Sequence, residues 1–137
     1  MAAMNYFEKW LTDLAQRQTM LLPKAVRVAG VRDKILGPRS DYAKIDVLCE
    51  PADSLEIKFD LPNLQEAQQH GYLDWAVMGM LDVLMTENTY PLRNVRLTIK
   101  GADIDSIKSN QMAFRHAGRN AARNLFEAIR PKVIPST

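Results

Sequence analysis

The last helical segment of the chain, from about Ser109 to Ile129, places the strongest constraint on the fold. Its apolar residues recur at helical spacing and form one stripe, which includes two alanines. The stripe consists of Phe114, Ala117, Ala121, Leu125 and Ile129. Small residues let a helix approach its neighbour closely, so we expect this side to lie on a sheet. Pro131 cannot continue a helix, which predicts the end just before it.

Three arginines of the same segment, Arg115, Arg119 and Arg123, follow one another at intervals of four on an adjoining face. Residues four apart are neighbours on a helix surface, so their guanidinium groups form a row. Donors in a fixed geometry that stay charged are suited to a phosphate backbone or another acidic partner. The alternative is a solvated face whose arginines pair with acidic residues of the chain itself. The sequence leaves both interpretations open.

A second set of basic residues occurs nearer the start of the chain, at Arg27, Arg32, Lys34, Arg39 and Lys44. Cations that alternate with apolar residues on a strand usually mark its solvent-facing side. The part that carries Lys34, Arg39 and Tyr42 favours binding more strongly, because an aromatic ring beside cations can stack on a base.

Alternation of apolar and polar residues predicts four strands. They cover residues 25–31, 42–48, 55–61 and 95–100. Gly37-Pro38 predicts a loop after the first strand, and residues 51–54 have the length of a tight connection between antiparallel neighbours. The fourth strand alternates apolar residues with Arg96, Thr98 and Lys100, which indicates that one of its faces is exposed to solvent.

Two further helices are expected, over residues 5–21 and 72–85. The first begins with a capping-type pair, Asn5 and Glu8, and carries an apolar stripe. The second has apolar side chains on nearly every side, which predicts a well-buried helix. The order is then helix, three strands, helix, strand, helix. It is satisfied economically by an α+β fold in which helices cover one face of a four-stranded mixed or antiparallel sheet.

The composition fits a single domain over residues 1–137. Apolar residues make up 47% of the chain and charged residues 25%, and no run is long and apolar enough to cross a bilayer. We therefore expect no membrane partner. Charged residues near the N-terminus interrupt any signal-peptide pattern, and the single cysteine, Cys49, excludes an internal disulfide. These features predict a cytoplasmic protein.

The net charge of +2 conceals three blocks of different sign. Residues 1–44 hold eight Lys/Arg and four Asp/Glu, residues 45–90 hold one and nine, and residues 91–137 hold nine and three. The blocks therefore carry +4, −8 and +6. Either they fold into one positive and one negative face that attract charged partners, or they neutralise each other across the fold.

Residues that carry chemistry give little support for an enzyme. His70 and His116 lack a Ser or Cys nucleophile motif, and no His, Asp or Glu spacing matches a metal site. No glycine-rich phosphate loop occurs. We expect two partly exposed histidines and a buried Cys49 that behaves as a small apolar residue. Catalysis, cofactor and metal are not expected.

Five short motifs follow one another along the chain at distinctive intervals. They are Gly37-Pro38-Arg39-Ser40-Asp41-Tyr42, Tyr72…Val77-Met78-Gly79, Tyr90-Pro91, Ser109-Asn110-Gln111-Met112-Ala113-Phe114 and Arg130-Pro131-Lys132. In order and spacing they resemble domain IV of translation elongation factor G. There the first is a tip loop with the sequence Gly-Gly-Arg-Gly-Gln-Tyr, and the fourth, Ser-Ser-Glu-Met-Ala-Phe, opens the last helix. The resemblance covers about residues 22–135.

This resemblance implies an α+β unit with a left-handed βαβ crossover, a fold shared with a small-subunit ribosomal protein and ribonuclease P protein. In the family, two tip loops enter the ribosomal decoding region during translocation. Here Arg39, Tyr42 and the loop 101–108, which ends at Lys108, would form the tip. Two glycines of the first loop are replaced by Pro38 and Ser40, and the second loop lacks the histidine usual in bacterial factors.

No counterpart of the family's GTPase domain is found among the 137 residues, so we do not expect this chain to drive translocation. Residues 5–21 also have no counterpart in domain IV. Our hypothesis is that they cover a surface that faces other domains in the whole factor.

The resemblance and the basic ends together predict a non-catalytic module that binds RNA or the ribosome. Its expected contacts are Arg39, Tyr42, Lys108, Arg115, Arg119 and Arg123. The alternative is a protein-interaction module that has lost RNA binding. In that case the acidic middle or the N-terminal helix would dock a protein partner.

Overall fold

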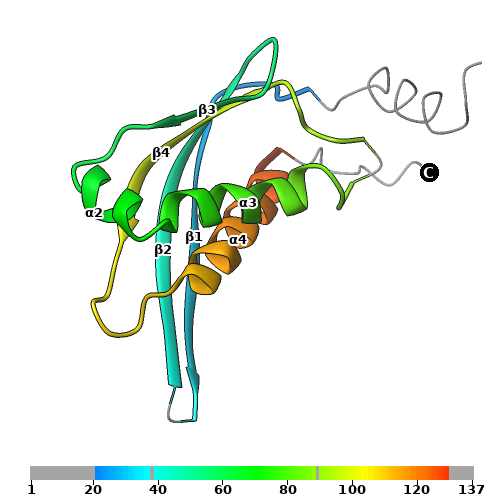
Figure 1. Cartoon of the computed structure of the whole chain (residues 1–137). Coiled ribbons are helices and arrows are strands. Elements are labelled where there is room, and N and C mark those ends of the chain that lie inside the picture. The colour runs from blue at the N-terminus through cyan, green and yellow to red at the C-terminus, as the bar shows by residue number, and fades with distance from the viewer. Residues whose placement is uncertain (1–20, 38, 89, 130–137) are drawn as a thin grey trace, which may run out of the picture.

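The computed structural model describes residues 21–37, 39–88 and 90–129. Its elements, in chain order, are β1 (Val26–Leu36), β2 (Arg39–Pro51), β3 (Glu56–Phe59), α2 (Leu64–Gln69), α3 (Tyr72–Leu84), β4 (Val95–Asp103) and α4 (Gln111–Ile129) (Figure 1). The helix expected over residues 5–21 lies, but for its last residue, outside the described ranges, as does the motif at 130–132. None of the described helices combines the length and apolar character that a membrane span requires.

The four strands form one mixed sheet in the order β1-β2-β4-β3. β2 is antiparallel to both β1 and β4, whereas β3 is parallel to β4. The class is therefore α+β, as predicted. One expectation is wrong: residues 51–54 do not join antiparallel neighbours, because β4 occupies the free edge of β2 and β3 pairs on its far side. The backbone N–H of Ala52 donates to the carbonyl of Asn94 (3.2 Å), so the connection between β2 and β3 begins beside the start of β4.

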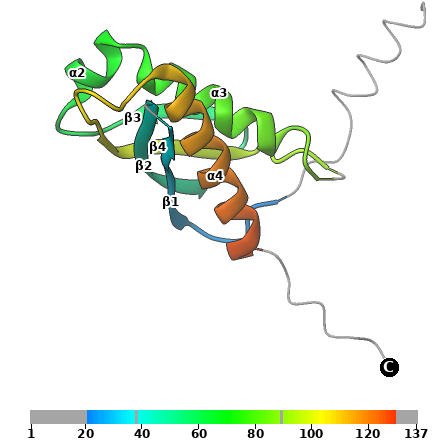
Figure 2. The ribbon, with the colours of Figure 1, turned by 90° about the horizontal axis from the view of Figure 1, so that it is seen from below.

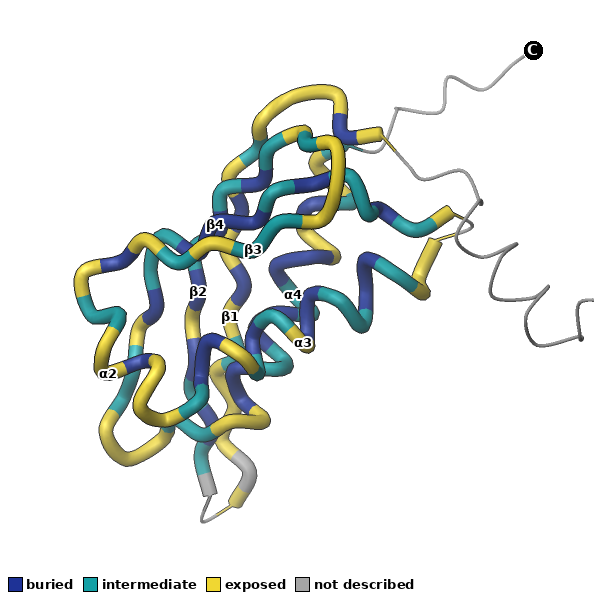
Figure 3. Tube along the Cα trace, turned by 45° about the horizontal axis from the view of Figure 1, so that its top comes forward, coloured by how far each residue is buried: buried dark blue, intermediate teal, exposed yellow. Residues whose placement is uncertain are grey.

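β1 and β2 form a hairpin that is longer than the alternating pattern predicts. Its register runs from Val26 opposite Cys49 to Leu36 opposite Arg39, and Gly37 adopts the left-handed conformation at φ 64° in the turn. The residues after position 31, where a loop was expected, belong to the strand. Their charged side chains interrupt the apolar–polar alternation, but their backbone pairs with β2. The hairpin extends past both long helices as a narrow arm (Figure 1). Its exposure increases toward the end (Figure 3).

The core lies between one face of the sheet and the two long helices, which cross beside it (Figure 2). Its fully buried strand residues are Ile45, Val47, Cys49, Val95, Leu97 and Ile99. Of the predicted α4 stripe, four members are fully buried and Ile129 is partly buried, which confirms the expected packing side. Each large side chain buried in this way contributes about 1.5–3 kcal/mol. α3 is less enclosed than expected, since Met78 is 38% exposed.

Glycines bring α3 and α4 into backbone contact. A Cβ built on Gly79 of α3 would lie 2.0 Å from the carbonyl oxygen of Arg115. A Cβ built on Gly118 of α4 would lie 2.0 Å from the carbonyl oxygen of Ala76. Gly30 of β1 has an equally close contact with α4. No side chain fits at these distances, so the relative position of the layers depends on the three glycines.

α4 also closes part of the outer edge of β1. The side-chain amide of Asn120 donates to the carbonyl of Val31 (2.8 Å), and that of Asn124 donates to the carbonyl of Ala29 (2.7 Å). Unpaired strand edges are templates for unwanted pairing, and the two amides satisfy two edge carbonyls. The edge beyond Val31 belongs to the projecting arm.

Candidate functional site

The arginine row of α4 is paired with acidic residues of the same chain. Asp82 accepts hydrogen bonds from the Nε atoms of Arg115 and Arg119, each at 2.9 Å, and from Nη2 of Arg115 at 3.1 Å. Arg123 donates to both carboxylate oxygens of Glu87 at 2.9–3.2 Å. The side chains of Arg115 and Arg119 are only 30% and 29% exposed. Of the two interpretations of this row, the structure favours pairing within the chain.

Asp82 holds this row together. The hydrogen bond from Arg115 is the main reason that the pKa of the Asp82 carboxyl is lowered; burial opposes it and Arg119 adds to it. The ionised carboxylate lies between two guanidinium groups that would otherwise repel each other. Arg115 also lies over the Trp75 ring, with 5.9 Å from its guanidinium carbon to the ring centroid. The row is therefore part of the α3–α4 interface.

The open face of the sheet shows the same kind of pairing. Arg27 with Asp46, Arg96 with Glu56 and Lys100 with Asp60 each approach to 2.6 Å. Like the pairs on α4, each joins a basic end of the chain to its acidic middle. All nine acidic residues of the middle block are described, and six of them are paired, at positions 46, 50, 56, 60, 82 and 87. The folded chain thus supports mutual neutralisation of the blocks.

The loop between β4 and α4 rests against the arm. The backbone N–H of Tyr42 donates to the carbonyl of Lys108 (3.1 Å), and the hydroxyl of Ser109 donates to the carbonyl of Tyr42 (2.7 Å). One residue along β2, the carboxylate of Asp41 accepts from the amide of Asn110 (2.8 Å). Two of the expected site residues, Tyr42 and Lys108, therefore meet through their backbones.

Arg39, a third expected site residue, is the first residue of β2 and pairs with Leu36 at the end of the arm. Nothing is described of its side chain. It lies three residues beyond Tyr42, on the part of the arm that projects past the loop.

Hydrogen bonds join the loop to itself and to α3. Oδ1 of Asp105 accepts from the backbone N–H groups of Ile107 (2.9 Å) and Lys108 (2.8 Å), and these bonds, that of Lys108 first, lower the pKa of its carboxyl. The hydroxyl of Tyr72 on α3 donates to the Ser109 carbonyl (3.2 Å) and ties the loop to the helices. Ile107 remains 90% exposed, so the ordered loop presents an apolar side chain outward.

The open side of the arm is acidic around Tyr42. Its hydroxyl lies 3.5 Å from Oδ2 of Asp103, and Asp33 is its cross-strand partner. Burial first, and then the charges of Asp103, Asp33 and Asp105, raise the pKa of the Tyr42 hydroxyl. The sequence suggested an aromatic ring among cations, but the ring lies among carboxylates, which repel phosphate.

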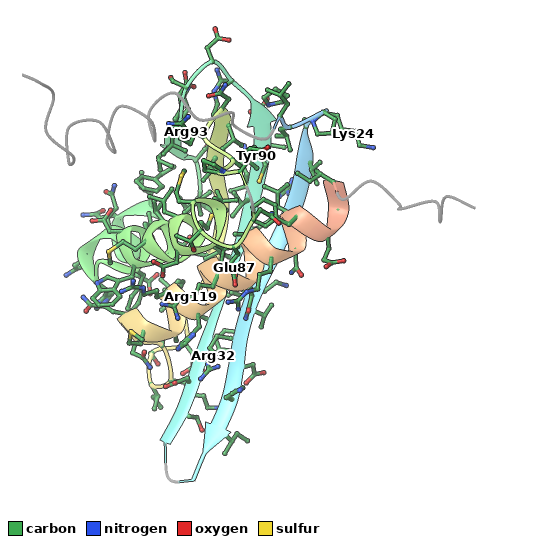
Figure 4. The ribbon with its side chains drawn as sticks, turned by 90° about the vertical axis from the view of Figure 1, so that its right-hand side faces the viewer. Lys24, Arg32, Glu87, Tyr90, Arg93 and Arg119 are labelled. Carbon is green, nitrogen blue, oxygen red and sulfur yellow. The ribbon has the colours of Figure 1, made fainter. Side chains whose placement is uncertain are left out.

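The helix-facing side of the arm is basic. Alternation along β1 turns Val28 and Gly30 toward the helices and continues with Arg32 and Lys34 on the same side. Figure 4 shows Arg32 on the arm just below α4 and Arg119 on the helix above it. These cations act on His116 of α4: burial first, then the charges of Arg32 and Arg119, lower the pKa of its imidazole.

Sequence reasoning missed this basic corner. It grouped Arg32 with the other basic residues of the first strand and its loop, and it placed His116 among the arginines of the last helix, but it did not bring the two groups together. The available signal was the alternation that starts at Val28, which reaches Arg32 and Lys34 once the strand is continued past residue 31. His116 joins them only through the helix-on-strand packing, which no local pattern encodes.

The other residues considered for chemistry take structural or peripheral positions. Cys49 is fully buried, and burial raises the pKa of its thiol to about 12, so it remains a protonated, apolar side chain. His70 is exposed and stacks on Tyr72, with ring centroids 5.1 Å apart. Within the described ranges, His, Cys, Asp and Glu side chains form no group able to hold a metal ion.

A pocket of about 560 Å³ lies at the other end of the sheet. Leu55, Leu81 and Met85 form its apolar wall, and Asp53 and Arg93 are among its polar lining residues. Figure 4 shows Arg93 at the end of the molecule opposite to the arm that carries Arg32. The pocket and the arm are therefore separate features.

Comparison with known proteins identifies a shared fold. No family model matches the chain, and no curated protein matches it. Among solved structures, the crystal structure of ttk003000868 from Thermus thermophilus is similar, with a TM-score of 0.69 at 15% sequence identity. The match covers 77% of this chain and 16% of the Thermus chain, so this fold corresponds to one part of a longer protein.

Proposed function

We propose that this domain is a non-catalytic RNA- or ribosome-binding module related to domain IV of elongation factor G. Three observations support the relation. The ordered motifs of the sequence resemble that domain, the sheet contains a parallel β3–β4 pair joined through helices, and a similar fold occurs as part of a longer chain. The proposal includes the left-handed β3–α–β4 crossover that the resemblance implies.

The observation that carries the functional proposal is the projecting end of the molecule. The β1–β2 arm and the loop 104–110 are far apart in sequence but are joined by the hydrogen bonds at Tyr42 and Asp41. In this proposal they take the place of the two tip loops that the resemblance implies, although residues 101–103 of the expected second loop belong to β4. A narrow projection with a basic side is suited to entering a groove or cleft lined by phosphates.

The direct test is sedimentation with purified ribosomes and binding to a structured RNA over a series of salt concentrations. We expect binding to weaken steeply as salt rises, because each neutralised phosphate releases counterions. Arg39→Glu/Lys108→Glu, placed at the projecting end, should weaken it further, whereas Lys58→Glu on β3 should not. Absent or salt-insensitive binding would contradict the proposal.

A protein-interaction role is the alternative. Its docking surface was expected on the acidic middle of the chain or on the N-terminal helix. Most carboxylates of the middle block are already bound to Arg or Lys of the same chain, which lowers their value for a basic partner. A single stoichiometric protein partner that survives nuclease treatment would favour this alternative over RNA binding.

A further inference from the structure

The two sides of the arm differ in the charged residues that they carry. On the open side, Asp33, Asp103 and Asp105 surround Tyr42. On the helix-facing side, alternation brings Arg32 and Lys34 toward His116 and Arg119 of α4, and the buried Asp41 of β2 lies opposite Lys34. A negatively charged ligand that meets this end of the molecule is therefore directed to one side, and the inner corner between β1 and α4 is the attractive one.

Arg32 has an unsatisfied hydrogen-bond donor in this corner. Its Nε is buried and has no hydrogen-bond partner among the described residues. A buried donor without a partner costs free energy, which an acceptor would recover once the side chain turns to meet it. Arg119 differs, because its Nε donates to Asp82. Arg32 therefore has an unused donor at the base of the arm.

The surroundings of His116 are consistent with a site for an anion. β1 contributes Arg32 and Lys34, α4 contributes Arg119, and β2 contributes Asp41, which alone favours the charged imidazole. Burial and the excess of cations favour the neutral imidazole and lower the pKa of His116. An anion in the corner would reverse this balance and favour the imidazolium.

We propose that the corner formed by Arg32, Lys34 and His116 binds a phosphate group of an RNA backbone. The corner then fixes which side of the arm faces the nucleic acid, with Tyr42 and its carboxylates turned away. Its assignment to RNA rests on the proposed function, whereas its capacity to bind phosphate does not. Arg32 donates through its guanidinium group, Lys34 adds a charge nearer the end, and His116 adds a donor when protonated.

The site itself is tested by following the imidazole resonance of His116 by NMR while pH is varied. In the free protein we expect its pKa below the ordinary value, for the reasons of burial and nearby cations given above. Inorganic phosphate, and separately a short duplex RNA, should raise this pKa in the wild type. Neither should do so in Lys34→Glu/Arg32→Gln. An unchanged His116 titration with both ligands would overturn the site.

Matched charge reversals test which side of the arm faces the nucleic acid. Lys34→Glu changes the helix-facing side and Lys44→Glu changes the open side of the same hairpin, and both residues are exposed. Lys34→Glu should weaken binding of the duplex about ten-fold. It should also make the decrease of log K with log salt less steep by about 0.9, the value for one phosphate contact. Lys44→Glu should change both much less.

The outcomes separate the two proposals. Equal effects of Lys34→Glu and Lys44→Glu, with RNA binding by the wild type, would overturn the inner corner but leave the RNA-binding function intact. A His116 response to inorganic phosphate without any RNA binding would support the corner and remove the function. Thermal unfolding of each variant shows whether lost binding comes from lost structure.

Discussion

Two groups of cations, one on α4 where it packs against α3 and one on β1 beside α4, differ in their partners. On α4, Arg115 and Arg119 share Asp82, and each forms a hydrogen bond of 2.9 Å to it. On β1, the Nε of Arg32 is buried without a partner among the described residues. The regular row therefore stabilises the domain, while the less regular group retains charge for a ligand. The two groups differ in the residues that the tertiary structure places opposite them, and their spacing along the sequence does not reveal this difference.

The largest expected effect comes from the glycine contact that positions α3 against α4. In Gly79→Ala the new Cβ would lie 2.0 Å from the Arg115 carbonyl oxygen, and this oxygen belongs to the backbone of a helix that cannot move alone. Overpacking should outweigh the gain in helix propensity, with a net loss of about 2 kcal/mol. The check is the free energy of unfolding from urea denaturation.

The matched control is Gly101→Ala. The nearest atom to its added Cβ is Cβ of Asp46 at 3.5 Å, which is an ordinary contact. A Gly79→Ala variant as stable as Gly101→Ala would mean that the helices do not touch through their backbones. Asp82 would then not be fixed between the two arginines, and the structural role that we assign to the α4 row would be wrong.

The same comparison explains how far the sequence could lead. The apolar stripe of α4 and the alternation of β4 are local, and both predicted their buried sides correctly. Local pattern wrongly predicted that residues 51–54 join antiparallel neighbours, because the parallel pairing of β3 with β4 depends on how the intervening helices return the chain. Only the resemblance, through its βαβ crossover, implied a parallel pair. The length of the arm was missed because Asp33 and Lys34 form strand through backbone pairing without an apolar pattern.

The candidate site shows the same limit. Tyr42 and Lys108 were expected together from the resemblance, and their backbones meet. The pairing of Arg115 and Arg119 was left open, because Asp82 lies 33 and 37 residues away in the sequence and only the helix crossing brings it near. Local patterns identify which side chains share a face, whereas partners across the core require the folded chain.

The next effect is that of the central carboxylate. Asp82→Asn leaves Arg115 and Arg119 close together without the charge that joins them, and we expect a loss of about 1–2 kcal/mol, moderated by the partial exposure of the site. Asp74→Asn, on an exposed position of the same helix, is the matched control and should change stability little. Equal stability of the two variants would show that the bridge contributes nothing.

The contribution of Asp82 should also depend on pH. Its pKa is lower in the folded chain than in the unfolded chain, so its stabilising effect is complete above the unfolded value near 3.8 and is lost as pH falls through the folded value. The stability difference between wild type and Asp82→Asn should therefore shrink in acid. Unfolding in urea at neutral pH and at about pH 3 checks this. A difference that is constant with pH would assign the effect to packing.

The smallest effect distinguishes the two cation groups most directly. Arg123 and Glu87 form a pair that is 52% and 40% exposed, so Arg123→Gln should cost less than about 0.5 kcal/mol and leave RNA binding nearly unchanged. Arg32→Gln removes a buried donor that has no partner to lose, so its stability should match or exceed that of the wild type while its RNA binding falls. Thermal unfolding and RNA titration of both variants provide the measurement. If Arg32→Gln loses stability and retains RNA binding, then Arg32 has a structural role, and the difference between the two cation groups does not concern ligand binding.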